Sequence, residues 1–441
     1  MPTLKSHRYL WFLTILLVTG STAWSEVVAR HGKGRLEKGE GGLVLTLAGT
    51  PYEMGFQHGK LVGDLVKHNL KAINNNQTAL SQTIEYKAYL TMRPLMHMML
   101  RRHIPKRFAE EMRGLADAVG VSYSEIEAVN LFPAAFHCSG MALMGKATHD
   151  GSLYHVRILD YMTKLGFQDA SLILVHEPEG LHRWINVGFA GIVGSVTGMN
   201  DQQITIGEMG GKGLFYWNGV PMTMLIRDAL ERASTLDEAV RIFRKSPRTC
   251  EYYYVISDAK IPDARGIWAT SRDFEAVKPG QTYGFVTVEK PGRGAAGKKS
   301  FGKDFRIDVT KHSILFRDQK GEVEGFIGRP PKDTVILSGH DRYQHFTRRL
   351  APAYGKVDEK VLQKMIRRPV SMKSNLHNAI FHPATLEVWV AVAASDGSPA
   401  CNQTYYRYSL APKAGNTQET PPAVKSLRNR AVPTTPKSTK R

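Results

Sequence analysis

The pattern of apolar residues changes abruptly at residues 137–138, and this change divides the chain into two parts of different secondary structure. Before it, one face of a predicted helix carries the apolar residues Phe108, Met112, Leu115, Ala116 and Val119. Gly120 ends that helix, and Ser122 with Glu125 forms a capping box for the next one. The stretch 51–132 is therefore predicted to be mainly helical.

After residue 138, short β-type runs dominate. They are predicted at 171–177, 183–189, 203–209, 251–257 and 266–270, with a hairpin formed by 376–381 and 386–393. Two helices interrupt them, at 222–233 and after a Thr235–Glu238 capping box, while 280–335 is rich in Gly and Lys and less regular. This order favours layered sheets covered by helices, an α+β fold class.

The stretch HCSGMALMGKATHDGSLYHVRILDY, residues 137–161, carries the candidate chemistry. We predict a strand at 139–144, a turn at 146–151 and a returning strand at 152–158. Such a hairpin places Cys138 beside Arg157 and Asp160, where a guanidinium favours the reactive thiolate. The alternatives are a buried structural cysteine and a surface ion pair of little energetic value.

The two ends of the chain differ from its middle. Charged residues, an apolar run from Tyr9 to Val18 and small residues at Ser21 and Ala23 predict a signal peptide over 1–25, with an uncleaved membrane anchor as the alternative. Residues 413–441 hold seven Lys or Arg and one acidic residue, and are predicted to be a basic, disordered tail. The expected location is secreted, periplasmic or in the cell envelope.

The net charge of +19 does not indicate nucleic-acid binding, because the basic residues form no aromatic-interleaved motif. Adhesion to anionic envelope polymers is compatible with it. Of the three cysteines, Cys250 and Cys401 could form a disulfide or remain two buried thiols. No cysteine–histidine spacing indicates a metal site, and no cofactor is expected.

The region from about residue 45 to 395 resembles the acyl-coenzyme A:6-aminopenicillanic acid acyltransferase family, which is related to choloylglycine hydrolases and acid ceramidase. Three features carry the resemblance. They are Cys138 followed by RILD at 157–160, GTPYEMGFQHG at 49–59, and GMNDQQITIG at 198–207.

This resemblance implies a four-layer αββα N-terminal-nucleophile fold made as an inactive precursor. The prosegment would span 26–137 and the catalytic domain 138–412, with self-cleavage between His137 and Cys138. The two resulting chains would stay associated, and Cys138 with its own α-amine would act on a small acylated amide or ester. The resemblance gives Asp160 the role of orienting that amine, and Arg157 that of stabilising the thiolate or substrate. Asn200 would donate to the oxyanion.

Two further candidates follow from the resemblance. Glu208 lies near the place where the ceramidase-like relatives have a functional glutamate. Many relatives also carry Thr-Asn-His in a late strand, but the nearest segment here, LSGHDRY at 337–343, lacks the asparagine. Asn375 is therefore a candidate for the second oxyanion donor.

Other interpretations start from the same residues. A papain-like thiol protease would use Cys138 with His377 and Asn378, but the local papain signature is absent. A serine hydrolase lacks its Gly-x-Ser-x-Gly elbow in GIVGSVTG at 191–198. A non-catalytic envelope-binding protein on the same fold is the third alternative, and it would need to retain none of Cys138, Arg157 or Asp160.

Overall fold

The structure, a computed structural model, describes residues 26–74, 84–131, 138–161, 163–210, 216–281, 306–309, 313–317, 323–328, 330–338 and 340–412. The predicted signal peptide, the basic tail and His137 of the predicted cleavage site lie outside these residues. Within the described part of the chain, no helix is both long and apolar enough to cross a membrane.

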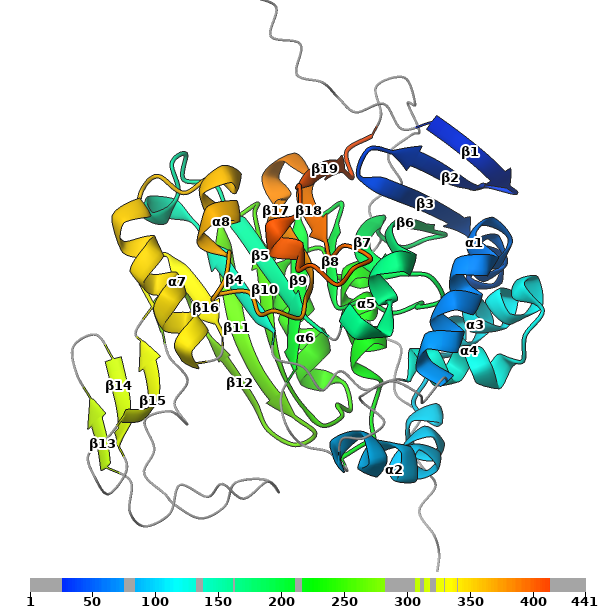
Figure 1. Ribbon diagram of the computed structural model, residues 1–441, viewed down its shortest axis with the longest axis horizontal. Helices are drawn as coiled ribbons and strands as arrows, with labels where there is room; N and C mark the ends of the chain where they lie inside the picture. The colour runs from blue at the N-terminus through cyan, green and yellow to red at the C-terminus, as the bar shows by residue number, and fades with distance from the viewer. Residues whose placement is uncertain are drawn as a thin grey trace, which may run out of the picture.

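Two sheets form the centre of the molecule (Figure 1). The larger has ten strands, in the order β1 (Glu26–His31), β2 (Gly34–Gly39), β3 (Gly42–Gly49), β6 (Ser171–Pro178), β7 (Trp184–Phe189), β8 (Thr197–Asn200), β9 (Ile204–Gly210), β10 (Glu251–Asp258), β11 (Asp263–Thr270) and β12 (Phe274–Val277). The smaller has six, in the order β16 (Thr334–Leu337), β4 (Ser139–Leu143), β5 (Tyr154–Asp160), β17 (Asn375–His382), β18 (Glu387–Val392) and β19 (Tyr406–Ser409). A separate three-stranded sheet comprises β13 (Arg306–Val309), β14 (Ser313–Arg317) and β15 (Val323–Gly328).

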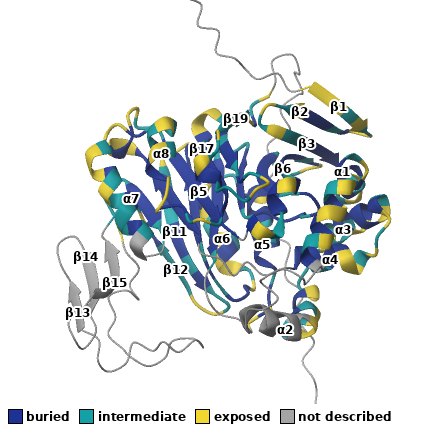
Figure 2. Ribbon diagram, in the orientation of Figure 1, coloured by how far each residue is buried: buried dark blue, intermediate teal, exposed yellow. Residues whose placement is uncertain are grey.

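Helices cover the outer face of each large sheet, so the layers follow the predicted αββα order. The helices α5 (Met222–Arg232) and α6 (Leu236–Lys245) share an apolar cluster with β9 and β10. The helices α7 (His340–Ala353) and α8 (Glu359–Met365) pack on β4 and β5. Between the sheets, side chains of β6 and β7 meet those of β17 and β18. Figure 2 shows the buried residues concentrated in the strands.

Because both faces of the smaller sheet are covered, its central strands are buried throughout. Every residue of β4 and of β5 is buried. Along β5, Tyr154, Val156 and Ile158 pack towards α7 and α8, while His155 and Arg157 contact Ser257 and Glu208 of the larger sheet, so the central strands lie between two layers. They hold the candidate hairpin in the middle of the molecule.

The helical part of residues 26–137, the predicted prosegment, matches the sequence-based prediction of helices at 51–132. It contains α1 (Pro51–Asn74), α2 (Ile84–Arg101), α3 (Lys106–Val119) and α4 (Tyr123–Asn130). The predicted apolar face of α3 is buried, and Gly120 ends it in a left-handed conformation. At α4 the capping box is complete, because Ser122 accepts from the backbone N–H of Glu125 and the Glu125 carboxylate accepts from that of Ser122.

The predicted prosegment also contains strands. Residues 26–49 form β1, β2 and β3, and β3 joins the larger sheet by pairing in parallel with β6. These strands were not predicted from the sequence. Glycines at the turns and the charged pair Glu37–Lys38 interrupt the alternation of polar and apolar residues that would indicate a strand. The part of the chain before Cys138 therefore supplies three strands of the ten-stranded sheet.

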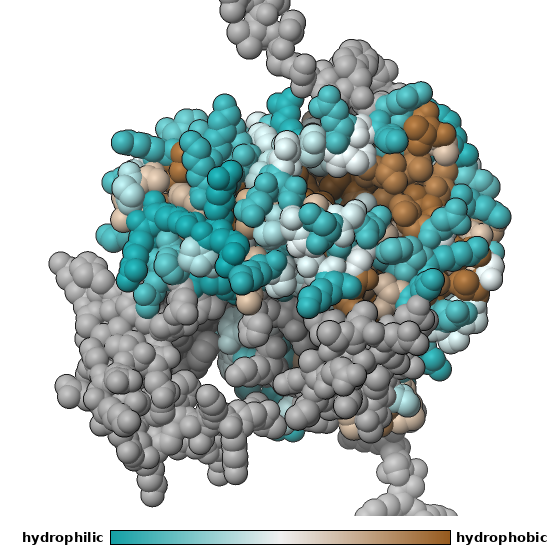
Figure 3. All heavy atoms as spheres, in the orientation of Figure 1, coloured by the Kyte–Doolittle hydropathy of each residue, from teal (hydrophilic) through white to brown (hydrophobic). Residues whose placement is uncertain are grey.

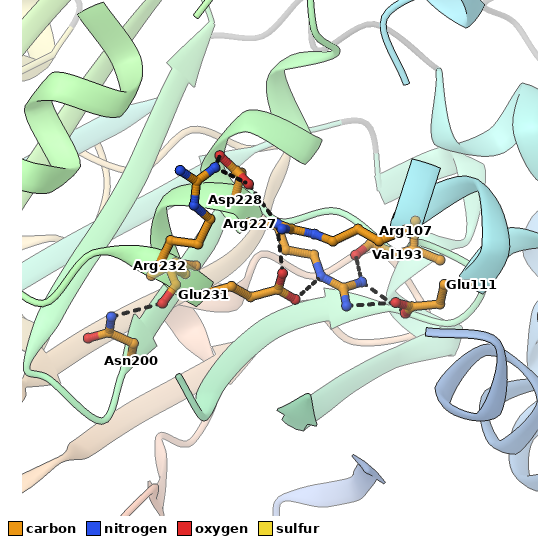
Figure 4. Close-up of polar contacts among 9 residues, drawn as sticks. Arg107, Glu111, Val193, Asn200, Arg227, Asp228, Glu231 and Arg232 are labelled. Atoms are coloured by element: carbon orange, nitrogen blue, oxygen red, sulfur yellow. Dashed lines mark hydrogen bonds and ion pairs between the residues drawn. The ribbon is translucent and has the colours of Figure 1, made fainter. Parts of the chain in front are cut away.

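An ionic network joins α3, before Cys138, to α5, after it (Figure 4). The Arg227 guanidinium contacts Glu111 Oε1 at 2.8 Å and Oε2 at 2.6 Å, and Glu231 Oε1 at 2.6 Å. Arg107 contacts the other oxygen of Glu231 at 2.9 Å. We call Arg107, Glu111, Arg227 and Glu231 the seam network, because they join residues on either side of Cys138.

Candidate active site

The predicted hairpin around Cys138 is present and forms the centre of the site. In the antiparallel pairing of β4 with β5, Ser139 is opposite Ile158 and Gly140 is opposite Arg157. Cys138 immediately precedes β4, so it lies at the sheet edge where β5 ends at Asp160. On the other side of β5, Asn375 at the start of β17 is opposite Asp160.

The Cys138 side chain is buried, with 4% of its surface exposed. Burial raises the pKa of its thiol, and the charges of Glu208 and Asp160 add to this rise. Arg157 and a hydrogen bond from the Asp160 backbone lower the pKa in part. The guanidinium thus acts in the direction expected from the sequence, but burial has the larger effect and favours the protonated thiol.

Arg157 reaches the site across a glycine of the facing sheet. A Cβ atom at Gly207 would lie only 3.0 Å from Arg157 Cδ, so a larger residue there would displace the arginine. The guanidinium bonds the carbonyl oxygen of Ile158, and its Nη2 lies 3.3 Å from Glu208 Oε2. The structure therefore brings Glu208 of β9 to Arg157, a contact that was not predicted from the sequence.

The Arg157–Glu208 pair is fully buried and incompletely satisfied. Both side chains are 0% exposed, and among the described residues neither Arg157 Nε nor Glu208 Oε1 has a hydrogen-bond partner. Burial raises the pKa of Glu208 to about 7, although Arg157 offsets part of the rise. An unpaired donor and acceptor at such a depth are costly to the fold and available to a reacting group.

Asp160 is held from two directions. Its Oδ1 accepts from the Met372 backbone N–H at 2.9 Å, and its Oδ2 pairs with the Arg342 guanidinium. Burial raises the pKa of Asp160 to about 6, with Arg342 the largest opposing influence. Arg342 also donates to the Cys138 carbonyl oxygen at 2.8 Å, so it connects Asp160 to the candidate nucleophile.

Arg342 was not predicted from the sequence. It lies in the LSGHDRY segment, which the pairing of Leu337 with Gly140 brings alongside Cys138. The Ser338 and Ser139 hydroxyls, 2.7 Å apart, support the same placement. A single arginine near the start of a helix has no spacing that would mark it in the sequence.

Asn200 does not join this cluster. Its Nδ2 donates to the Leu230 and Ala233 carbonyls at 2.8 Å each, and its Oδ1 accepts from the Gln202 and Ile204 backbones. The side chain is thus fully engaged at the C-terminal end of α5 on the outer face of the larger sheet. In this arrangement its amide has no free donor for an oxyanion, contrary to the prediction.

Asn375 lies beside Asp160, but its amide is also occupied. Its Nδ2 contacts the Leu159 and His377 carbonyls and Asn378 Oδ1, and its Oδ1 accepts from the Cys401 backbone. These contacts hold the starts of β17 and the 400–402 turn in place. They give Asn375 a positioning role and leave its candidate role as an oxyanion donor without an available N–H.

His377, the candidate base of a papain-like enzyme, has another partner. Its Nε2 lies 3.0 Å from Thr197 Oγ1, and its ring stacks on Phe189. Burial lowers the pKa of the imidazole well below its ordinary value. This environment is that of a structural histidine between two sheets.

Cys250 and Cys401 are both free and buried, so the predicted choice is resolved in favour of two separate thiols. Burial raises the pKa of the Cys250 thiol to about 11. Neither thiol is activated for chemistry in this structure. Among the described residues, no group of three His, Cys, Asp or Glu side chains could hold a metal ion.

Comparison with known proteins tests the resemblance directly. The family described as acyl-coenzyme A:6-aminopenicillanic acid acyl-transferase matches residues 147–264. The chain resembles this acyltransferase family, as its motifs predicted. The matched stretch contains Arg157, Asp160, Asn200 and Glu208 but begins nine residues after Cys138.

Individual relatives extend the likeness beyond the acyltransferase match. An uncharacterized protein of Archaeoglobus fulgidus is 25% identical over 73% of this chain and 56% of its own length. The rat N-acylethanolamine-hydrolyzing acid amidase is 27% identical over 35% of this chain and 44% of its own length. The chain thus spans about half the length of the curated relatives it matches.

A solved structure, the Caenorhabditis elegans ortholog of N-acylethanolamine-hydrolyzing acid amidase, aligns with 62% of this chain and 100% of its own. Its sequence identity is 14% and its TM-score is 0.36.

Proposed function

We propose that this chain is a secreted precursor that cleaves itself before Cys138 and then acts as a cysteine N-terminal-nucleophile amide hydrolase or acyltransferase. The family match and the named relatives support the general class of amide hydrolase or acyltransferase. The observation that carries the proposal is the cluster of Cys138, Arg157, Asp160 and Glu208 at one buried edge of the sandwich.

In the proposed self-cleavage, Cys138 Sγ attacks the carbonyl carbon of His137. The peptide C–N bond breaks, the nitrogen takes the thiol proton and becomes the α-amine of Cys138, and a thioester remains. Water then hydrolyses the thioester, which leaves a carboxylate on His137 and restores the thiol. The raised pKa of Cys138 fits a precursor whose thiol stays protonated until this step.

In the mature enzyme the new α-amine accepts the thiol proton, and the thiolate attacks the acyl carbon of a small amide or ester. The amine or alcohol leaves with that proton, and water or a second amine takes the acyl group from sulfur. In this proposal Asp160 orients the α-amine, and its contacts with Arg342, which also bonds the Cys138 carbonyl, and with the Met372 backbone support that role. The free Nε–H of Arg157 is the donor that we assign to the oxyanion.

Self-cleavage is tested by intact mass. The wild-type protein should give a light chain ending at His137 and a heavy chain starting at Cys138. Cys138→Ala should remain one chain because no nucleophile is left, whereas Cys250→Ala, a matched change at another buried free cysteine, should still be cleaved. Cleavage of Cys138→Ala at the same bond would assign the cut to an external protease. N-terminal sequencing of exported protein should begin between Trp24 and Glu26, and recovery of Met1 would contradict export through a cleaved signal.

Catalysis is tested separately with a chain that starts at Cys138 and a prosegment supplied in trans. Arg157→Ala and Asp160→Asn should each lower kcat/KM on an active acyl amide at least about tenfold, or about 1.4 kcal/mol. Asp237→Asn, an exposed carboxylate in the first turn of α6, should have no such effect. Full activity after acetylation of the α-amine would place the general base elsewhere.

A further inference from the structure

A second cavity, apart from the Cys138 cluster, lies where the prosegment hairpin meets the C-terminal strand. Its volume is about 320 Å³, at the lower end of the range for ligand sites. The β2–β3 turn, β6 and β7 form one side, and β18 with β19 forms the other. In Figure 3 this face shows a hollow with hydrophobic atoms at its floor.

The depth of the cavity is apolar. Ile173, Val187 and Val390 line it and belong to the core between the two sheets. An occupant would therefore extend an apolar part into the sandwich, where contact with these side chains removes hydrocarbon from water.

Its polar lining is neutral. Gln168, Ser171, Gln403, Thr404, Tyr406 and Tyr408 supply hydroxyl and amide groups, and none of the described residues around the cavity carries a charge. In a chain with a net charge of +19, an anion site would be expected to include Lys or Arg. The lining selects against a carboxylate and, having no acidic residue, against a cation.

Gln168 supplies a specific contact. The residue is 8% exposed, and its Nε2 donates to the Thr163 carbonyl at 2.9 Å. Among the described residues its Oε1 has no donor, although Gln168 lines the cavity. A buried amide oxygen of this kind accepts a hydrogen bond from an O–H or N–H group.

The wall of the cavity joins the two parts of the chain. Gly41, at the β2–β3 turn, accepts a hydrogen bond from the Tyr408 hydroxyl at 2.5 Å. A Cβ at Gly41 would lie 2.2 Å from that hydroxyl oxygen, so the turn can approach β19 only because residue 41 is glycine. Leu43 continues the same wall. An occupant would contact both the prosegment and the catalytic part.

The cavity and Cys138 lie at the same edge of the smaller sheet but on different strands. Val392, at the end of β18, is separated from β4 by β5 and β17. Three strand spacings of about 4.8 Å give a separation of roughly 14 Å.

From these observations we propose that the cavity binds a neutral amphipathic molecule. Its alkyl chain lies between the sheets against Val187 and Val390, and its hydroxyl or amide N–H donates to Gln168 Oε1. Because Gly41 and Leu43 form part of the wall, the bound molecule secures the prosegment hairpin to the catalytic part.

The test uses the full-length Cys138→Ala protein, so that neither cleavage nor turnover interferes. Three probes of equal chain length are titrated by calorimetry below their micelle concentrations: 1-monolaurin, laurate and dodecyltrimethylammonium. Monolaurin should bind with a Kd at least about tenfold lower than either ion, and it should raise the Tm as expected for a ligand of the folded state.

Variants assign the binding to this cavity. Val187→Trp, which fills the floor, and Leu43→Trp, at the partly exposed wall, should each weaken monolaurin binding at least about tenfold. Gln168→Leu should weaken it about fivefold, the range of one hydrogen bond. Arg407→Gln, on β19 but outside the lining, is the matched control and should bind like the parent.

Three results would overturn the proposal. They are no monolaurin binding by a folded parent protein, equal affinity for the neutral and charged probes, and unchanged binding in both Val187→Trp and Leu43→Trp. If Val187→Trp fails to fold, Leu43→Trp decides alone. Because the parent lacks Cys138, none of these results depends on whether the chain is an enzyme.

Discussion

Two ionic clusters, the seam network and the cluster around Cys138, differ in how closely their opposite charges approach each other. In the seam network each of the four carboxylate oxygens of Glu111 and Glu231 lies 2.6–2.9 Å from a guanidinium nitrogen. In the Cys138 cluster the Arg157–Glu208 contact is longer, 3.3 Å. Hydrogen bonding is incomplete in both: Arg157 Nε and Glu208 Oε1 have no hydrogen-bond partner among the described residues. The same holds for Arg107 Nε, Glu111 Oε2 and Glu231 Oε2. The Arg157–Glu208 and Arg227–Glu111 pairs are both excluded from water, whereas the Arg107 side chain of the seam network is 25% exposed.

The difference indicates what each cluster is for. A network in which every carboxylate oxygen lies close to a guanidinium stabilises one geometry in a medium of low polarity, and here it joins α3, before Cys138, to α5, after it. A more loosely paired cluster keeps donors and acceptors for atoms that arrive later, such as a developing oxyanion. The same residue types thus serve as a structural connection in one region and as a candidate site in the other.

The largest expected effect tests the structural side of this comparison. Arg227→Met leaves Glu111 and Glu231 buried without their main partner, and should lower the free energy of unfolding by about 3–5 kcal/mol. Urea denaturation measures it. Arg232→Ala, which breaks an exposed ion pair at the end of the same helix, is the control and should cost less than about 1 kcal/mol. Equal effects of the two variants would show that the seam network does not hold the parts together.

The second prediction concerns pH and the Cys138 cluster. The folded protein raises the pKa of Asp160 to about 6, compared with about 3.9 in an unfolded chain. Between these values the folded state holds a proton that the unfolded state has released, so stability falls as the pH rises from 4 to 7. The contribution of Asp160 to this fall is about 3 kcal/mol.

The free energy of unfolding of Cys138→Ala, measured at pH 4 and at pH 7, gives the fall in stability. Adding Asp160→Asn should remove the part of this fall that Asp160 contributes. Asp237→Asn in the same background should leave the fall unchanged. If the free energy of unfolding changes equally with pH in Cys138→Ala with and without Asp160→Asn, the assigned burial of the Asp160 charge is wrong.

A third prediction separates Asn200 from catalysis. Asn200→Ala should lower stability by about 2 kcal/mol, because two carbonyls at the end of α5 and two backbone N–H groups lose their partners. Its kcat/KM on any active amide should stay within about twofold of wild type. A loss of about 100-fold without loss of stability would restore Asn200 as an oxyanion donor.

Local patterns predicted much of the fold, because capping boxes and helix periodicity depend on neighbouring residues. The α3 face, the Ser122–Glu125 cap and the Cys138 hairpin were all predicted in this way. The strands of residues 26–49 were not, since they gain their stability from β6, more than 120 residues later.

The residues of the candidate site divide in the same way, into those that local patterns predict and those that depend on contacts between distant parts of the chain. Arg157 and Asp160 were predicted because one hairpin carries them with Cys138. Arg342 was missed because only the pairing of β16 with β4 brings its segment to Cys138. Asn200 was placed in the site by its motif, whereas the end of α5, 30 residues later, engages its amide. Contacts over such separations leave no periodic signal in a single sequence.

The smallest expected effect tests whether Arg342 acts through Asp160. Arg342 lowers the pKa of Asp160, so Arg342→Gln should move the acid limb of the pH dependence of kcat/KM upward by about one pH unit. The plateau above that limb should fall less than in Asp160→Asn, because the Met372 N–H still holds the carboxylate. Arg342→Lys keeps a positive charge and should restore most of the limb's position while losing the second bond to the Cys138 carbonyl. If Arg342→Gln lowers the plateau and leaves the limb in place, Arg342 acts on Cys138 directly, and the link through Asp160 is wrong.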